Sequence, residues 1–296
     1  MPNAKLLNYL HLHFIVFIWG FTAVLGALIS IDALDLVWFR MSIASLLILA
    51  WVGYKKIPLT FSKKTMLVFL LAGAIIAMHW LAFFGAIKTA NVSITLAIMS
   101  TGSFFTALLE PIFYKRKVIW YEVVFGLVVV LGLYVIFQVE GDYSWGIILA
   151  LISSFLGALF SVINGKLAVR YNASAISFYE LFFGVCCISL YLFFSGSFDA
   201  SFFILSISDW GYLFILASGC TAYAFIASVH VMKWISPYTV MLTINLEPVY
   251  GIVLALLILG ESENMGPQFY YGAAIIILTV LANGIIKNRI KKKLKN

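Results

Sequence analysis

Charged residues are scarce in this sequence. Only 10% of its 296 residues are Asp, Glu, Lys or Arg, whereas 64% are hydrophobic and the mean hydropathy is +1.07. Soluble chains carry about 25% charged residues. The 12 acidic and 19 basic residues are too few to cover the surface of a soluble fold of this length. This scarcity excludes an ordinary soluble domain and indicates that lipid contacts most of the surface.

Signatures of catalysis and of nucleotide binding are missing. The sequence has no GxxxxGK[ST] loop, no GxGxxG after a strand and no HExxH pair. Its three cysteines, Cys186, Cys187 and Cys220, lie in apolar runs without a CxxC partner or a histidine at ligand spacing. We therefore expect no metal, no cofactor and no disulfide, and we predict that the chain is not an enzyme.

Long apolar runs fill most of the chain. A helix that crosses the hydrocarbon core needs about 20 apolar residues, and ten runs with short linkers meet that need. The sequence therefore predicts an all-α membrane protein with ten transmembrane helices. The predicted spans are 10–31, 36–54, 65–87, 91–113, 119–139, 145–165, 174–195, 210–233, 237–259 and 267–287.

The charges between these spans separate by sign. The net charge of +7 comes from short basic clusters between apolar runs, which argues against a nucleic-acid partner. With the N-terminus in the cytoplasm, the cytoplasmic segments hold 17 of the 19 basic residues. This bias is the positive-inside pattern and predicts that both termini are cytoplasmic. The cytoplasmic set is Lys5, Lys55, Lys56, Lys63, Lys64, Lys115, Arg116, Lys117, Lys166, Arg170, Lys233 and the tail from Lys287 to Lys295; the opposite loops hold Asp32, Asp35, Lys88, Glu140, Asp142, Asp199, Asp209, Glu261 and Glu263.

The two halves of the chain are related by an offset of 146 residues. This offset pairs Gly73 with Gly219 and Gly126 with Gly272. Five spans per half is an odd number, so the second half must enter the membrane from the opposite face. The sequence thus predicts two inverted five-helix repeats, residues 5–140 and 145–287, followed by a basic tail at 288–296. Inverted repeats are common in secondary transporters.

Short motifs lie along the predicted spans in a fixed order. They are Trp19-Gly20, Arg40, Pro248 and Gly260-Glu261. In these motifs, and over about residues 9–287, the chain resembles the EamA family of the drug/metabolite transporter superfamily. The resemblance implies two five-helix repeats and export of amino acids or similar solutes without ATP, in a bacterial inner membrane. Gly102 stands where the second repeat has Pro248, so we expect the fourth and ninth helices to bend differently.

Glu247 is the deepest acid in the predicted membrane. Charged groups at the centre of a membrane helix cost about 2.5–3.5 kcal/mol on insertion scales, so they need a partner or a wet cavity. Pro248 follows Glu247 and interrupts the helical hydrogen bonds. Thr243 and Tyr250 share its helix face, and Asn245 lies beside it. These residues form either a proton-coupling or substrate-amine site, or an acid paired with a neighbouring helix.

Arg40 lies near the outer end of its span in the first repeat, and Glu180 lies near the inner end of its span in the second repeat. Arg40 could bind a substrate carboxylate or phosphate with its planar fork. The alternative, which we favour, is that Arg40 extends outward or pairs with Asp32 or Asp35. For Glu180 we likewise favour a pairing at the cytoplasmic end, with Lys166 or Arg170, over a role in a binding or coupling site.

Two further titratable residues lie within spans. Glu110 precedes Pro111 near the basic cluster 115–117, and we expect it to pair locally there. His79 could relay protons, because the reference pKa of histidine is near 6.5. A hydrogen bond between helices is the more frequent role for such a histidine.

Aromatic and small residues suggest cavity walls, although packing is the commoner role for both. Trp19, Trp80, Tyr179 and Tyr223 are deep enough to line a pocket for a flat or amphipathic solute. Small-residue stripes let membrane helices pack closely, or face water. The two stripes are Thr22, Gly26 and Ser30, and Ser153, Gly157, Ser161 and Asn164.

These patterns predict a multi-pass secondary transporter of small metabolites that works by alternating access. Its expected partners are a small-molecule substrate, membrane lipid and protons. A flippase for lipids or lipid-linked head groups and an intramembrane enzyme stay open as alternatives. A receptor is disfavoured, since no signalling segment follows the last span. The sequence leaves the substrate, the direction, the coupling ion and the oligomeric state open.

Overall fold

The computed structural model describes the backbone of residues 2–115, 117, 119–139 and 141–293, and over these residues it is helical without a strand. Each of the ten predicted apolar spans falls on one helix or on consecutive helices. The unbroken helices are α1 (Pro2–Leu28), α2 (Ala33–Tyr54), α3 (Lys63–Thr89), α6 (Trp120–Val139), α7 (Ser144–Leu167), α8 (Ala173–Ser195) and α13 (Pro267–Lys293).

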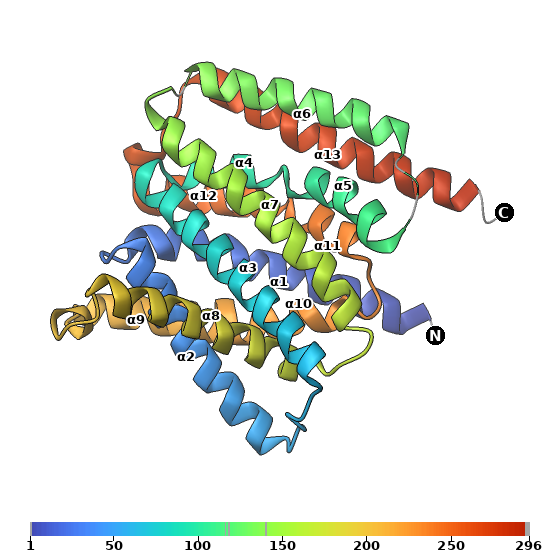
Figure 1. Cartoon of the computed structure of the whole chain (residues 1–296). Coiled ribbons are helices and arrows are strands. Elements are labelled where there is room, and N and C mark those ends of the chain that lie inside the picture. Colours follow the sequence, from blue (N-terminus) through green and yellow to red (C-terminus); the bar gives the residue numbers. More distant parts are fainter. Residues whose placement is uncertain (1, 116, 118, 140, 294–296) are drawn as a thin grey trace.

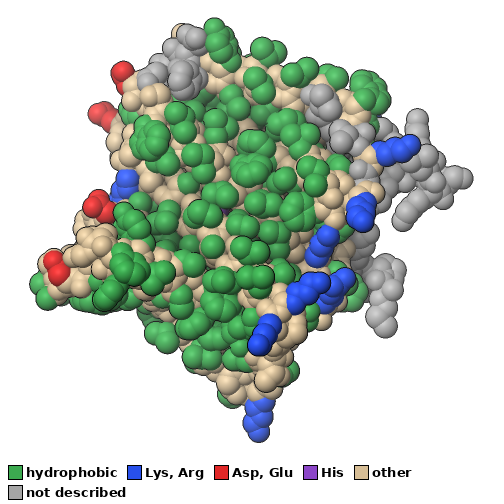
Figure 2. All heavy atoms as spheres, in the orientation of Figure 1, with side chains coloured by type: hydrophobic (Ala, Val, Ile, Leu, Met, Phe, Trp, Pro, Cys, Tyr) green, Lys and Arg blue, Asp and Glu red, His purple; other side chains and the backbone are tan. Residues whose placement is uncertain are grey.

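Within the described residues, eight helical segments are long and apolar enough to cross a membrane. Two further apolar stretches are shorter, Val124–Ile136 within α6 and Pro267–Asn283 within α13. Hydrophobic side chains cover most of the visible face of the molecule (Figure 2). The chain is therefore an integral multi-pass membrane protein.

Two spans are broken at the same point of their repeat. Helices α4 (Val92–Met99) and α11 (Pro237–Ile244) each have 8 residues, and α5 (Gly102–Tyr114) and α12 (Glu247–Leu259) each have 13. The prediction that these spans bend differently is therefore wrong. Gly102 and Pro248 both lie at the start of the second piece, so a residue without a side chain and one without an N–H occupy equivalent positions at the break.

The broken spans lie side by side in the middle of the bundle. Helix α4 packs on α12 and α5 packs on α11, so the two spans run antiparallel (Figure 1). The last helices of the two halves, α6 and α13, also pack together and form one edge of the molecule (Figure 1).

Carboxylates of one half cap helices of the other. The Glu263 carboxylate accepts hydrogen bonds from the backbone N–H groups of Val92 (3.0 Å) and Ser93 (2.8 Å) at the start of α4. Glu110, which is 4% exposed, accepts one from the N–H of Tyr238 at the start of α11 (2.8 Å). Glu110 therefore caps a helix of the other half, because the free N–H groups of a helix start favour a negative partner.

Basic and acidic side chains gather at opposite ends of the bundle (Figure 2). We call these the basic end, which carries the loops at 55–62 and 168–172, and the acidic end, which carries those at 29–32 and 196–206. Lys5, Arg116, Glu140, Lys287 and the lysines of the tail lie outside the residues whose side chains are described. The segregation of the described charges agrees with the predicted pattern.

Candidate functional site

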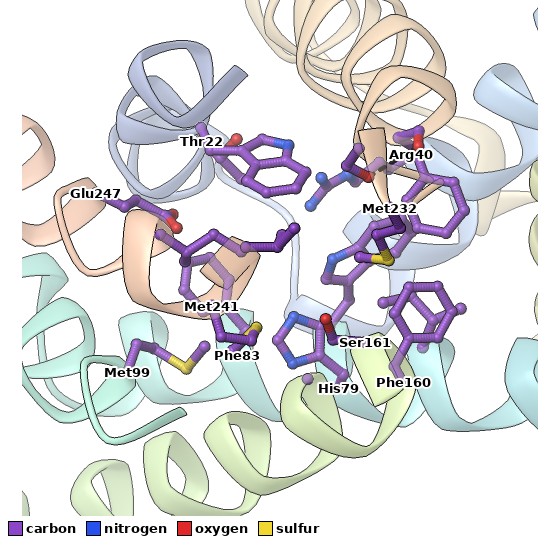
Figure 3. A pocket seen from close by; sticks show the side chains of 18 residues that line it. Thr22, Arg40, His79, Phe83, Met99, Phe160, Ser161, Met232, Met241 and Glu247 are labelled. Atoms are coloured by element: carbon purple, nitrogen blue, oxygen red, sulfur yellow. Dashed lines mark hydrogen bonds between the residues drawn. The ribbon is translucent and has the colours of Figure 1, made fainter. Parts of the chain in front are cut away.

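A pocket lies among helices of both halves (Figure 3). Most of its wall is apolar, with charged groups at two places. Its walls come from α1, α2, α3, α7, α10, α11 and α12, where α10 is Ala224–Val231, and from Met99 at the end of α4. The lining side chains are Trp19, Thr22, Arg40, Ile76, His79, Trp80, Phe83, Met99, Phe160, Ser161, Phe225, Ser228, Met232, Val240, Met241, Ile244 and Glu247, with Gly157.

Arg40 is buried in this wall with 1% of its surface exposed. Its Nε donates a 2.6 Å hydrogen bond to Thr221 Oγ1, and its guanidinium carbon lies 4.0 Å from the centre of the Trp80 ring. Its Nη1 has no hydrogen-bond partner among the described residues. The expectation that Arg40 extends outward or pairs with Asp32 or Asp35 is therefore wrong. The aromatic face stabilises the cation inside the bundle.

A π-helical turn positions the partner of Arg40. The segment Ser218–Tyr223 separates α9 (Ile207–Ala217) from α10, and within it Thr221 Oγ1 donates to the carbonyl of Leu216, five residues earlier (2.7 Å). The same oxygen accepts from Arg40. Single π turns occur frequently at functional sites. Here the turn aims a hydroxyl at a buried guanidinium.

Glu247 faces Arg40 from the opposite side of the pocket (Figure 3). It begins α12, directly before Pro248, so its carboxyl group lies at a helix N-terminus that favours negative charge. Within the described chain its carboxylate accepts no hydrogen bond, and Arg40 is the charged side chain across the pocket from it. The pocket therefore holds a positive and a negative group on facing walls.

His79 lines the pocket and also joins two helices. Its Nδ1 lies 2.8 Å from the carbonyl oxygen of Ser153 and 3.0 Å from the Ser153 hydroxyl. The Ser153 hydroxyl in turn donates to the His79 carbonyl (3.0 Å). This geometry fits the expected hydrogen bond between helices, here between α3 and α7.

Aromatic and methionine side chains make up the apolar wall. Trp19 donates its indole N–H to the carbonyl of Cys220 (3.2 Å), so its ring is fixed. The Phe225 ring lies 5.7 Å from Trp80 and 5.4 Å from Phe160. Methionine is flexible and adapts to ligands of varied shape. The methionines of the wall are Met99, Met232 and Met241.

Three residues expected near Glu247 lie outside the pocket. Thr243 donates to the carbonyl of Thr239 in its own helix (2.9 Å), and Asn245 donates to the Ser103 hydroxyl (3.0 Å). Tyr250 packs against α1, with its ring 5.5 Å from that of Phe17. These residues stabilise the break between α11 and α12.

The other predicted site residues also lie elsewhere. Tyr179 donates to the carbonyl of Leu59 (2.6 Å), and Tyr223, 44% exposed, bonds His11 (2.9 Å). Glu180 is fully buried and accepts a hydrogen bond from Asn164 (3.0 Å). Its expected pairing with Lys166 or Arg170 is therefore wrong.

Some residues of the two small-residue stripes line the pocket, and others pack helices together. Thr22, Gly157 and Ser161 line the pocket, as a cavity wall requires. Ser30 instead bonds Asp209 through its N–H and its hydroxyl (2.7 Å each), and Gly26 packs against Phe84. The methionines, Phe160, Phe225 and Ser228 also line the pocket and were not predicted from the sequence. The position of Met99 and Met241 beside the helix breaks is the signal that could have found two of them.

Comparisons with known proteins agree with this architecture. The sequence model of the EamA-like transporter family matches twice, at residues 8–138 and 144–284. A crystal structure described as "Crystal structure of protein" has the same fold with a TM-score of 0.69; it is 15% identical in sequence, and the match covers 94% of this chain and 97% of that one. No curated protein shows significant similarity to the chain.

Proposed function

Because the chain belongs to the EamA-like transporter family, we propose that it is a secondary transporter of small amphipathic zwitterions, with apolar amino acids as the first substrate class. It is a carrier in this proposal and not an enzyme. The site for the substrate is the pocket between Arg40 and Glu247.

The opposed charges of Arg40 and Glu247 carry this proposal. The guanidinium of Arg40 can donate to a carboxylate, and the carboxylate of Glu247 can accept from an ammonium group, because both residues line the pocket. Hydrogen bonds to charged groups stabilise by about 1.5–3 kcal/mol each. The aromatic and methionine side chains between them provide an apolar surface for the rest of the solute. A solute with both charges and an apolar body would make favourable contacts with every wall of the pocket.

Alternating access between two inverted repeats is the mechanism we propose. It is supported by the matched lengths of the broken helices, by their antiparallel packing and by the two family matches. In this proposal ten helices cross the membrane, with the repeats at 5–140 and 145–287 and the tail at 288–296. Because the pocket draws residues from both repeats, a relative tilt of the repeats would open it to one side and then to the other.

We further propose that the basic end and both termini face the cytoplasm of a bacterium and that the protein exports its substrate. The charge segregation supports this orientation. An anionic inner leaflet would also attract the basic loops.

Counterflow in proteoliposomes tests the proposal. Vesicles preloaded with unlabelled L-phenylalanine should accumulate the tritiated amino acid, whereas vesicles preloaded with a nucleoside or an organic cation should not. Glu247→Gln should weaken apparent affinity at least about tenfold, because it removes the charge that binds the ammonium group. Glu261→Gln is the matched control, since Glu261 is exposed and outside the pocket. Equal counterflow by wild type and Glu247→Gln would contradict the proposed site.

A further inference from the structure

Glu180 is an acid without a counter-charge in the centre of the bundle. It is 0% exposed, as are Asn164 and Ser177. Its Oε1 accepts a hydrogen bond from Asn164 Nδ2 (3.0 Å), while its Oε2 has no hydrogen-bond partner among the residues that the structure describes. Burial of an ionised carboxylate without a cation is very costly, and most of all within a membrane. The arrangement fits a neutral carboxyl group, with the carbonyl oxygen held by Asn164 and the proton on Oε2.

The elements that pack against Glu180 offer it no positive partner among the described residues. Helices α2, α3 and α10 contact α8, and α7 reaches it through Asn164. Arg40 on α2 is bonded to Thr221, and His79 on α3 is bonded to Ser153. Lys166 on α7 lies over the rings of Phe113 and Tyr114 (5.7 and 5.3 Å).

The remaining titratable groups on these elements are directed elsewhere or exposed. Lys88 bonds the carbonyl of Ile29 at the acidic end, and Tyr179 bonds that of Leu59. Asp35 lies near Asp32. The exposed groups are Lys55, Lys56, Lys63, Lys64, Tyr54, Arg170, Tyr191, Cys186 and His230, with Cys187 half-buried.

Among the described residues, the atoms around Glu180 that lack hydrogen-bond partners are oxygens. They are Asn164 Oδ1 and Ser177 Oγ, with Ser161 Oγ one turn earlier on α7. Each is an acceptor, and a hydroxyl both donates and accepts, so these groups can pass a proton. A bare metal cation needs a full shell of oxygen ligands, and the described residues contain no cluster of three or more acidic, histidine or cysteine side chains to hold one. The surroundings therefore favour a proton over a metal cation.

The buried acid adjoins the pocket but does not line it. Ser161 faces the pocket, and Asn164 lies three residues further on α7, on the same helix face. The α3 and α8 backbones meet here at Gly73 and Gly184, so that a Cβ placed on Gly73 would lie 2.5 Å from the Glu180 carbonyl oxygen. A shift of α8 against α3 would thus expose Glu180 and reshape the pocket wall together.

We propose that Glu180 is a proton-binding site, separate from the substrate site, whose proton couples transport to a pH gradient. The inference rests on the proposed transport function. In one conformation the carboxyl group is protonated and buried, as seen here. In another the Oε2–H bond breaks, the proton passes to water, and the resulting carboxylate keeps its hydrogen bond from Asn164. Asn164 is then a positioning residue and Glu180 the group that carries the proton.

Two transport assays in proteoliposomes distinguish a loss of proton coupling from a loss of substrate binding. Both use tritiated L-phenylalanine as the probe. One measures exchange at equal pH on both sides, and the other measures accumulation against a concentration gradient, driven by a pH gradient. Exchange requires no net proton movement. We expect Glu180→Gln to lose at least about 90% of the gradient-driven accumulation, whereas exchange continues and shows that the variant is folded and binds substrate. Glu261→Gln should behave as wild type in both modes.

Asn164→Leu tests the positioning role. It removes the N–H that stabilises the ionised carboxylate, so the midpoint of the pH profile of driven accumulation should move to higher pH. A purely structural role would lower the rate at every pH and leave the midpoint in place.

Infrared difference spectroscopy gives a readout that needs no substrate. A pH titration of purified wild-type protein should show a protonated-carboxyl band that is missing in Glu180→Gln. Absence of phenylalanine flux in wild type would count against the proposed transport function. The infrared band would still test whether Glu180 binds a proton. The inference is overturned if Glu180→Gln keeps its pH-driven accumulation, if the band is unchanged, or if a sodium gradient drives accumulation in place of the pH gradient.

Discussion

Arg40 and Thr221 join the two halves of the protein through one hydrogen bond. The Nε of Arg40 on α2 donates to Thr221 Oγ1 in the π-helical turn, over 2.6 Å, inside the buried wall of the pocket. The bond fixes the guanidinium over Trp80, and Nη1 has no hydrogen-bond partner among the described residues. Arg40 therefore keeps one buried donor that a substrate carboxylate could satisfy.

Thr221→Val should impair transport more than it impairs folding. Valine keeps the shape of threonine and removes the acceptor, which leaves a second donor of Arg40 unpaired at a cost of about 1–3 kcal/mol. We expect a five- to tenfold weaker apparent affinity for L-phenylalanine, on the order of 1 kcal/mol. Thr243→Val is the control, because Thr243 donates only to a carbonyl of its own helix. Equal effects of the two variants would argue against a positioning role.

Ser161→Cys should react with a small polar thiol reagent in a background without the three native cysteines. Ser161 lines the pocket with 2% of its surface exposed, so we expect the reagent to reach it when the proposed cycle opens the pocket, and bound substrate should slow the reaction. Ser154→Cys should stay unreactive, because Ser154 is buried outside the pocket, where it bonds Thr101. Equal labelling rates for Ser161→Cys and Ser154→Cys would show that the reagent does not reach position 161 through the pocket.

Gly73→Ala should lower the melting temperature of the purified protein. A methyl group there would meet the backbone of α8, 2.5 Å from the carbonyl oxygen of Glu180 and 3.2 Å from the N–H nitrogen of Gly184. Overpacking of this kind costs about 1–3 kcal/mol. Gly53→Ala should be neutral or stabilising, since nothing lies within 4 Å of the added atom. Thermal unfolding in detergent, followed by intrinsic fluorescence, compares the two.

Glu263→Ala should destabilise the start of α4. It removes the acceptor for two buried N–H groups, those of Val92 and Ser93, and each unpaired group costs about 1–3 kcal/mol. Amide hydrogen exchange in α4 should rise, whereas Glu261→Ala, at an exposed position two residues away, should leave it unchanged. Unchanged protection of α4 in Glu263→Ala would show that the cap contributes little.

The helical spans and several site residues could be predicted because lipid penalises charge so strongly. Arg40, Glu247 and His79 stood out as titratable groups inside apolar runs, and all three line the pocket. The cost of placing charge in lipid also explains why most charged residues lie in the loops. The broken spans were harder, since Gly102 and Pro248 differ in chemistry yet occupy equivalent breaks.

The rotation of each helix about its axis was the main feature that the sequence did not reveal. Helices that are apolar all round carry almost no periodic signal. Tyr179 and Tyr223 were therefore assigned to the pocket, although the structure directs them to Leu59 and His11. The helix cap formed by Glu110 was hidden for a related reason. The N–H of Tyr238, which donates to it, lies in the other half of the chain, and the local sequence shows only the nearby basic residues.

The placement of Arg40 and Glu247 on facing walls also bears on the response of the carrier to voltage. Moving one elementary charge through 100 mV changes its free energy by about 2.3 kcal/mol. The two pocket charges cancel, and a zwitterion adds no net charge, so the loaded pocket and the empty pocket are electrically alike. A membrane potential would then act on the cycle through the proton of Glu180. The ratio of electric current to substrate flux would count the protons moved with each substrate molecule.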